Sequence, residues 1–175
     1  IIGGAGKLYP VETWQALLDA LDAANWRVNG RRVRLRLLSQ SNVFSNRPET
    51  QIEFLGWRGQ DEAVALLAES DLLYCPYWFA PYFEWVARLS FPGKMTTYLA
   101  TGRPVMFHGP KYSSPARFLD CHKAGLVCDS LDPAEIRAAL NRIATDEALY
   151  AELACRGRQA FDEHLTTRSM RTHFS

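Results

Sequence analysis

Short apolar runs alternate with helix-length amphipathic stretches along the whole sequence, and this alternation constrains the fold more than any other feature. Six runs predict strands, at residues 1–2, 33–37, 52–55, 71–75, 104–107 and 125–128. Between the first two runs, Trp14, Leu17 and Leu21 recur at helical spacing and predict one apolar helix face. Repeated strand–helix units pair in parallel through right-handed crossovers. The sequence therefore predicts a three-layer, doubly wound α/β domain with a mainly parallel sheet of about six strands.

Helix starts and loops are marked by residues with defined backbone preferences. The predicted helix caps are the oxygen-bearing side chains of Asp61, of Ser113 or Ser114, and of Asp132. Residues 39–50 are polar and predict a loop, and residues 76–92 predict a long loop rich in aromatic side chains. The last helix is predicted over about residues 146–164.

The composition is that of an ordinary globular domain. The 175 residues fit one domain, and a net charge of +1 gives no support to bulk binding of nucleic acid or of a charged membrane. Positive charge does gather locally, at Arg31, Arg32, Arg34 and Arg36. This cluster is interpreted as the solvated edge of a strand, with a basic patch for anionic lipid or nucleic acid as the alternative.

The four cysteines form no C-x-x-C pair and match no common zinc spacing, so no metal site is predicted. They favour a reduced, cytoplasmic protein, and no apolar run approaches the roughly 20 residues that span a bilayer. The chain begins at Ile1 inside a predicted strand. We therefore expect it to be a fragment of a longer polypeptide.

The loop after the first strand is glycine-rich but fits neither common phosphate-binding pattern. Leu8 stands where a P-loop needs a hydroxyl, and Tyr9 stands where a dinucleotide fingerprint needs its third glycine. Gly4 and Gly6 therefore have two interpretations: a tight strand-to-helix turn, or a close approach of the backbone to a ligand.

The segment from Ser90 through Pro92, Gly93 and Lys94 leads into a predicted helix and is the most informative part of the sequence. A helix start offers free amides and the positive end of a dipole, and glycine lets an anion come near. Lys94 adds a positive charge, and nearby threonines add hydroxyls. The combination predicts a pyrophosphate site, with a capped helix and a solvated lysine as the alternative.

The run FPGKMTTYLATGRPVMFHGPKYSS resembles the C-terminal domain of GT-B-fold glycosyltransferases of group 1, in particular bacterial enzymes that build surface polysaccharides. Supporting pieces occur in the expected order: IEFLGW, ESDLLYCP and AGLVCDSLDPAEIRAAL. The resemblance covers nearly the whole chain. It implies that residues 1–175 form a single Rossmann-like domain, the donor-binding C-terminal half of a two-domain enzyme.

The resemblance also implies where a nucleotide-sugar donor would bind. The predicted donor-binding residues are Gly4, Gly6, Trp57, Arg58, Ser90, Pro92, Gly93, Lys94, Met95, Thr96, Thr97 and His108. Trp57 and Arg58 would face the base, and the start of the helix would face the phosphates. Many relatives carry two glutamates eight positions apart, where this chain has Leu89 and Thr97. The catalytic residues stay unassigned, with Lys94 and Arg58 as candidates.

The activity implied is transfer of a sugar from a nucleotide-diphosphate-sugar donor to a glycan or lipid-linked acceptor, with no separate cofactor and no metal. The partner would be the N-terminal acceptor-binding domain of the same protein, which would also supply any peripheral contact with the inner face of the membrane. The fragment alone is expected to be inactive.

Two alternatives keep the fold and change the function. The aromatic loop contains Trp78, Tyr82, Phe83 and Trp85, which could pack in the core, cover a sugar ring, or meet a partner protein or membrane in a non-catalytic homologue. A GT-B-type sugar-nucleotide epimerase would need carboxylates and a histidine in the cleft, and His108 is the best-placed histidine.

Overall fold

The computed structural model describes residues 1–40, 44 and 46–166, and its centre is a six-stranded parallel sheet. The strand order is β5–β4–β1–β6–β7–β8, and every pair is parallel. The strands are β1 (Ile2–Ala5), β4 (Leu35–Leu38), β5 (Ile52–Phe54), β6 (Leu72–Pro76), β7 (Val105–His108) and β8 (Leu126–Cys128). The predicted parallel α/β sheet of about six strands is confirmed.

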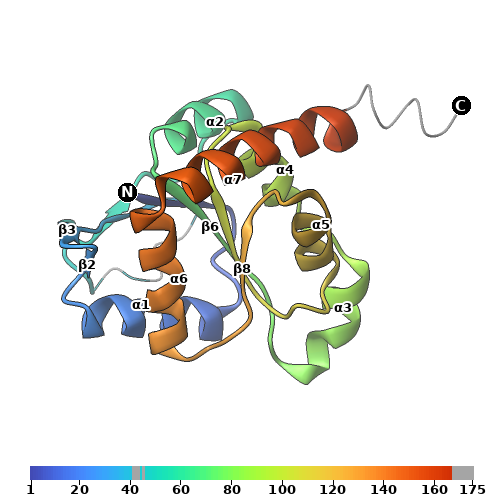
Figure 1. The fold of residues 1–175 in the computed structure, drawn as a ribbon. Helices are drawn as coiled ribbons and strands as arrows, with labels where there is room; N and C mark the ends of the chain where they lie inside the picture. The colour runs from blue at the N-terminus through green and yellow to red at the C-terminus, as the bar shows by residue number, and fades with distance from the viewer. Residues whose placement is uncertain (41–43, 45, 167–175) are drawn as a thin grey trace, which may run out of the picture.

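Helices cover both faces of this sheet, so the domain has three layers (Figure 1). Helices α1 (Val11–Ala23) and α6 (Pro133–Thr145) lie side by side on one face. The other face carries α2 (Gln60–Ala68), α4 (Gly93–Ala100), α5 (Ser114–His122) and α7 (Glu147–Ala160). Alternate residues of each strand point to opposite faces. In β6, Leu72 and Tyr74 enter the core under α1, whereas Leu73 and Cys75 enter the core under α4.

The order of the strands creates a switch point between β1 and β6. From β1 the chain moves outward through β4 and β5, and then returns to the other side of β1 as β6. The crossover connections on the two sides therefore diverge at the carboxyl ends of β1 and β6, which is where open α/β sheets bind ligands. We call this part of the molecule the switch-point edge.

Several predicted helix boundaries are confirmed and one is wrong. Ser113 caps α5 and Asp132 caps α6, where Pro133 is the first helical residue. Asp61 does not cap α2, because that helix already begins at Gln60 after Gly59 and Asp61 lies within its first turn. The last predicted helix divides into α7 and a π-helical turn, η2 (Phe161–Leu165).

Two local structures differ from the sequence prediction. The predicted aromatic loop contains a 3₁₀ turn, η1 (Pro81–Phe83), followed directly by a short helix, α3 (Glu84–Leu89). A small antiparallel hairpin, β2 (Arg27–Val28) and β3 (Arg31–Arg32), turns at Asn29 and Gly30, both with positive φ. Primed two-residue turns favour this Asn-Gly pair. Part of the predicted loop at 39–50 lies outside the described residues.

Among the four clustered arginines, Arg36 is neutralised by two carboxylates. Its guanidinium lies 2.7 Å from Glu53 and 2.7 Å from Glu69, and these contacts raise its pKa. The remaining three arginines lie on or near the small hairpin. In the described ranges, no helix has both the length and the hydropathy that crossing a bilayer requires.

Candidate functional site

The turn after β1 carries two glycines with different surroundings. A side chain at Gly4 would meet the ring of Trp14 at 3.1 Å and Leu37 at 3.3 Å, so the close packing against α1 and β4 favours a glycine there. Gly6 is exposed, has a φ of +83°, and donates its amide to the carbonyl of Leu38 at 2.8 Å. Gly6 therefore shapes an open turn, whereas Gly4 sits in the core.

Lys94 brings this turn together with the start of α4. Its ammonium donates to the main-chain carbonyl of Lys7 at 3.3 Å, and its Cε lies 4.0 Å from the Cβ position of Gly6. Burial lowers the pKa of Lys94, and the neighbouring Cys75 opposes that effect. The structure thus brings together the two segments from which the sequence predicted a phosphate site, and it puts a partly buried cation between them.

The start of α4 is open to solvent. Pro92 is the N-cap and provides no side-chain cap, and a side chain at Gly93 would meet no atom within 4 Å. The amides of Gly93 and Lys94 lie in the first turn, where a helix has no carbonyl to accept from them. Met95 differs, because its side chain is fully buried and its amide already donates to the Pro92 carbonyl at 2.9 Å. An anion would therefore meet the amides of Gly93 and Lys94.

A second helix start, that of α2, reaches the same edge. The side-chain amide of Gln60 donates to the hydroxyl of Thr97 at 3.1 Å. The sequence indicated that the loop at residues 56–60 faces a ligand, because it follows a strand, but it gave Gln60 no role of its own. The pair leaves two donors, the Thr97 hydroxyl hydrogen and the second amide hydrogen of Gln60, beside an acceptor, the Gln60 carbonyl oxygen.

Trp57 and Arg58 lie on the turn that leads into α2. The Trp57 side chain is 65% exposed, which is unusual for an indole and leaves its ring free to stack. Arg58 is held locally, because its guanidinium pairs with Glu62 at 3.0 Å and also donates to the Trp57 carbonyl. Of these two predicted residues, Trp57 therefore presents the less engaged side chain.

His108 lies inside the protein. It is fully buried, its Nδ1 lies 2.6 Å from the Tyr74 hydroxyl, and its Nε2 lies 2.6 Å from the Ser130 carbonyl oxygen. Burial lowers its pKa to about 4, so the ring is neutral at pH 7. Because a carbonyl can only accept, the neutral ring carries its hydrogen on Nε2. Its Nδ1 then accepts from the Tyr74 hydroxyl, whose single hydrogen is shared with the Thr13 carbonyl at 3.0 Å. His108 thus links β7 to β6 and to the turn at Ser130.

The residues that precede α4 form a closed segment, residues 77–90, which we call the aromatic segment. The Tyr77 hydroxyl donates to the Ser90 carbonyl at 3.0 Å and so joins its two ends. Leu89 is 81% exposed, and Glu84 forms an ion pair with Arg88 at 2.8 Å. Leu89 has no carboxylate, and the carboxylate of Glu84 is paired with Arg88, so neither residue supplies a free carboxylate to the start of α4.

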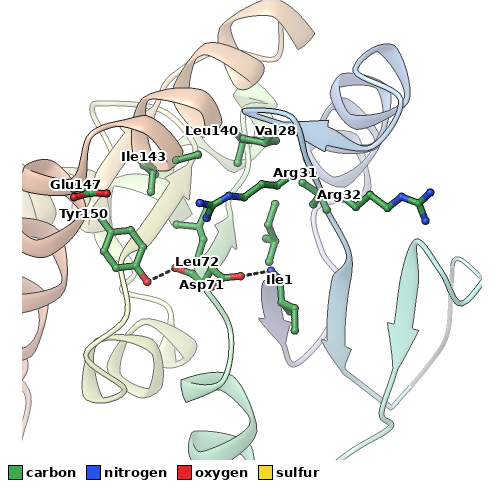
Figure 2. Close-up of a pocket in the computed structure, with 13 residues that line it drawn as sticks. Ile1, Val28, Arg31, Arg32, Asp71, Leu72, Leu140, Ile143, Glu147 and Tyr150 are labelled. Carbon is green, nitrogen blue, oxygen red and sulfur yellow. Dashed lines mark hydrogen bonds and ion pairs between the residues drawn. The ribbon is translucent and has the colours of Figure 1, made fainter.

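A cavity of about 370 Å³ lies at the opposite, amino edge of the sheet (Figure 2). The hairpin β2–β3, helix α6 and the start of α7 enclose it, with Leu72, Leu140 and Ile143 among its apolar lining residues. None of the predicted donor-binding residues lines it.

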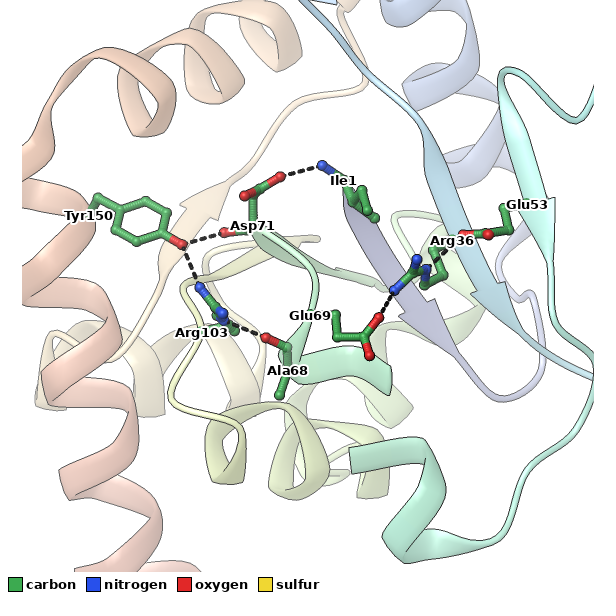
Figure 3. Close-up of polar contacts among 8 residues, drawn as sticks. All are labelled: Ile1, Arg36, Glu53, Ala68, Glu69, Asp71, Arg103 and Tyr150. Carbon is green, nitrogen blue, oxygen red and sulfur yellow. Dashed lines mark hydrogen bonds and ion pairs between the residues drawn. The ribbon is translucent and has the colours of Figure 1, made fainter. Parts of the chain in front are cut away.

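Polar contacts at this amino edge tie the elements together (Figure 3). The Tyr150 hydroxyl donates to the Asp71 carbonyl at 2.9 Å, and Arg103 donates to the Ala68 carbonyl at 2.7 Å. The amino group of Ile1 pairs with the Asp71 carboxylate. These contacts hold α7 and the end of α2 against the start of β6. In the part of the chain that the structure describes, no three histidine, cysteine, aspartate or glutamate side chains are grouped as metal ligands.

Comparison with known proteins gives one family and many similar structures. A family model described as glycosyl transferases group 1 matches residues 1–146. No curated protein matches the sequence. HepE from Anabaena, solved with UDP and glucose, is 16% identical with a TM-score of 0.71, over 99% of this chain and 46% of that chain.

Two further solved glycosyltransferase structures are similar to this chain to about the same degree. The C-terminal domain of LpcC, a glycosyl transferase group 1 family protein from Francisella tularensis, is 14% identical with a TM-score of 0.68, over 95% of this chain and 86% of that chain. WaaG, a glycosyltransferase involved in lipopolysaccharide biosynthesis, is 14% identical with a TM-score of 0.69, over 98% of this chain and 45% of that chain. The chain spans 34% of TarM and 46% of HepE, less than half of either.

Proposed function

The chain belongs to the group 1 glycosyltransferases, and from this premise we propose that its switch-point edge binds the diphosphate of a nucleotide-sugar donor. The observation that carries the proposal is the position of Lys94. Its ammonium lies between the open start of α4 and the turn at Gly6, in contact with the Lys7 carbonyl. A partly buried ammonium beside unpaired helix-start amides is complementary to a diphosphate.

The proposed reaction breaks the bond between the anomeric carbon of the sugar and the phosphate oxygen. The sugar is transferred to an acceptor hydroxyl, which loses its proton, and a nucleoside diphosphate leaves. Negative charge grows on that diphosphate in the transition state, so a fixed ammonium and oriented amides lower the barrier. Lys94 and the start of α4 would supply this stabilisation from the present chain.

The nucleoside would extend from the diphosphate toward α2. Gln60 and Thr97 present a donor next to an acceptor, which suits a vicinal diol such as that of ribose. The exposed indole of Trp57 lies just before α2 and would stack on the base. We therefore propose the order diphosphate, ribose and base from α4 to the turn at Trp57.

The acceptor would be held mainly by another domain of the same protein. The chain covers only 34% of TarM and 46% of HepE, and a donor bound at the switch-point edge would still need a second surface to meet an acceptor. The proposed acceptor is a glycan or a lipid-linked glycan. We assign removal of the acceptor proton to neither Lys94 nor Arg58, since Lys94 would bind phosphate and the Arg58 guanidinium is paired with Glu62.

Calorimetric titration of UDP and GDP tests the donor site. We expect one nucleoside diphosphate to bind, and the corresponding monophosphate and nucleoside to bind progressively more weakly. If the full-length protein gives no heat with any nucleoside diphosphate, the donor site is not where we propose it.

One observation favours a second candidate, a nucleotide-binding homologue that transfers no sugar. Leu89 and Thr97 stand where many relatives carry acids, and the nearby Glu84 is paired with Arg88. Incubating the full-length protein with UDP-sugars and GDP-sugars separates the two candidates, because only the enzyme releases nucleoside diphosphate during transfer or slow hydrolysis.

A further inference from the structure

Two large aromatic side chains in the segment that precedes α4 are exposed to solvent. Tyr82 is 80% exposed and Trp85 is 66% exposed, whereas Tyr77 in the same aromatic segment is almost fully buried. Tyr82 belongs to η1 and Trp85 to α3, three residues later along a continuous helical stretch. Residues three apart on such a stretch lie on the same side. We call Tyr82 and Trp85 the aromatic platform.

The platform rests on a rigid base. The amides of Phe79 and Ala80 both donate to the carboxylate of Glu12 at 3.2 Å, which fixes the start of the segment to α1. The end is fixed by the bond from Tyr77 to Ser90 and by the Arg117 guanidinium, which donates to the Arg88 carbonyl at 3.3 Å. The platform is therefore ordered before a ligand arrives, which reduces the entropy cost of binding.

The platform lies close along the chain to the proposed diphosphate site. Only Ser90, Phe91 and Pro92 separate α3 from α4, so the end of the platform helix and the start of the phosphate-binding helix are neighbours at the switch-point edge. Helix α3 also packs against α5, and Arg88 lies over the Tyr112 ring at 4.5 Å.

The charge and chemistry of the platform favour a neutral, hydroxylated ligand. The charged residues of η1 and α3 are Glu84 and Arg88, which pair with each other, so these two elements carry no net charge of their own. Aromatic rings offer a flat apolar face to ring C–H groups, and the hydroxyl and indole N–H offer polar tips. A pyranose has the matching pair of features.

We infer that Tyr82 and Trp85 stack on a pyranose ring of the acceptor glycan, and this inference rests on the donor site proposed above. The chain would thereby contribute directly to acceptor recognition. The substrate class is a neutral saccharide, and the two rings determine affinity for it without taking part in bond breaking.

Saturation-transfer NMR on the full-length protein tests this inference, with and without saturating UDP or GDP. The probes are the methyl pyranosides of glucose, galactose, mannose and rhamnose. We expect at least one to bind, and Trp85→Ala and Tyr82→Ala each to weaken it by roughly threefold to tenfold, the factor for one lost ring contact. Trp85→Phe should restore most of the affinity.

Leu89→Ala is the matched control, because Leu89 is an equally exposed apolar residue on α3 but has no ring. It should leave glycoside affinity unchanged. The inference is overturned if no glycoside binds, if Trp85→Ala binds as wild type does, or if Leu89→Ala weakens binding equally. It is also overturned if vesicles of phosphatidylglycerol protect the rings, or if another domain of the full-length protein buries them.

The nucleotide results stay separate from the glycoside results. The platform variants should bind UDP or GDP as wild type does, since neither ring contacts the start of α4. If a nucleotide binds but no glycoside does, the proposed donor site is supported and the role of the platform in sugar binding is contradicted. If no nucleotide binds, the proposed donor site is contradicted, and the glycoside titrations alone then test whether the platform binds sugar.

Discussion

The ammonium of Lys94 donates a hydrogen bond to the main-chain carbonyl of Lys7, with 3.3 Å between nitrogen and oxygen. These residues are far apart in the sequence, and the contact joins the first turn of α4 to the turn after β1. An ammonium has three hydrogens, so this bond leaves others for a ligand. The contact therefore directs the Lys94 side chain toward the turn after β1 and leaves its positive charge free to interact with a ligand.

Replacing Lys94 by methionine should weaken binding of a nucleoside diphosphate by roughly tenfold to a hundredfold, the range for losing a charge-assisted hydrogen bond. Lys123→Met removes the same charge at the end of α5 and should leave the affinity unchanged. Calorimetry at several pH values adds a second reading. Burial lowers the pKa of Lys94, so wild-type affinity should fall as the pH rises through that lowered value. Equal losses in both variants would contradict the assignment.

The hydrogen bond between Gln60 and Thr97 predicts discrimination between ribose and deoxyribose. The wild-type protein should bind a ribonucleoside diphosphate about twofold to tenfold more tightly than its 2′-deoxy analogue, the range for one neutral hydrogen bond. Thr97→Val keeps the shape and removes the hydroxyl, so the ratio of the two dissociation constants should approach one.

Thr145→Val is the control for that substitution, because Thr145 ends α6 and its hydroxyl donates only locally to Asn141. Its ratio should match the wild-type ratio. Affinity for the 2′-deoxy analogue itself should change little in either variant. A wild-type protein that binds both nucleotides equally would show that the Gln60–Thr97 pair does not contact the sugar.

Local sequence signals predicted the sheet and many helix starts. The apolar runs located the six parallel strands, and the oxygen-bearing caps Ser113 and Asp132 located two helices. These features depend on residues that are neighbours in the sequence, which is why a pattern could find them. The aromatic segment was harder to predict, because α3 is only six residues long and the two ends of the segment are held by Glu12 and Arg117 from distant helices.

Contacts between distant segments also explain what was missed at the candidate site. No pattern near Thr97 indicates that Gln60 reaches it, since the pair depends on how α2 and α4 pack. His108 ends a strand, and the sequence alone indicated only that it was the best-placed histidine. The structure buries it, because Tyr74 on the neighbouring strand and the Ser130 carbonyl enclose both ring nitrogens.

The burial of His108 predicts a loss of stability in mild acid. Its pKa is lowered from 6.5 to about 4, so the folded protein favours the neutral ring while the unfolded chain takes up a proton. The stabilisation is complete above pH 6.5 and is lost as the pH falls toward 4, by an amount on the order of 3 kcal/mol. Urea unfolding from pH 7 to pH 4 should show this slope in wild type and in His122→Gln. His108→Gln should be less stable at pH 7 and lack this part of the slope; an unchanged slope would mean that another group titrates.

Substitutions at two glycines near the switch-point edge should have different effects, one on nucleotide affinity and the other on the free energy of unfolding. A Cβ at Gly93 would meet nothing within 4 Å, whereas a Cβ at Gly109 would lie 2.7 Å from the Tyr77 side chain and 2.9 Å from the Phe107 ring. Gly109→Ala should therefore lower the free energy of unfolding by about 1–3 kcal/mol, the usual cost of overpacking.

Gly93→Ala should instead keep or raise the free energy of unfolding, by up to about 1 kcal/mol, because alanine favours the helix. Its methyl group would stand where we propose that the diphosphate approaches the amides of Gly93 and Lys94. Nucleotide affinity should fall although stability does not, and urea unfolding beside calorimetry measures both. If Gly93→Ala binds nucleotide as tightly as wild type, the diphosphate does not approach this backbone, and the start of α4 loses its proposed role.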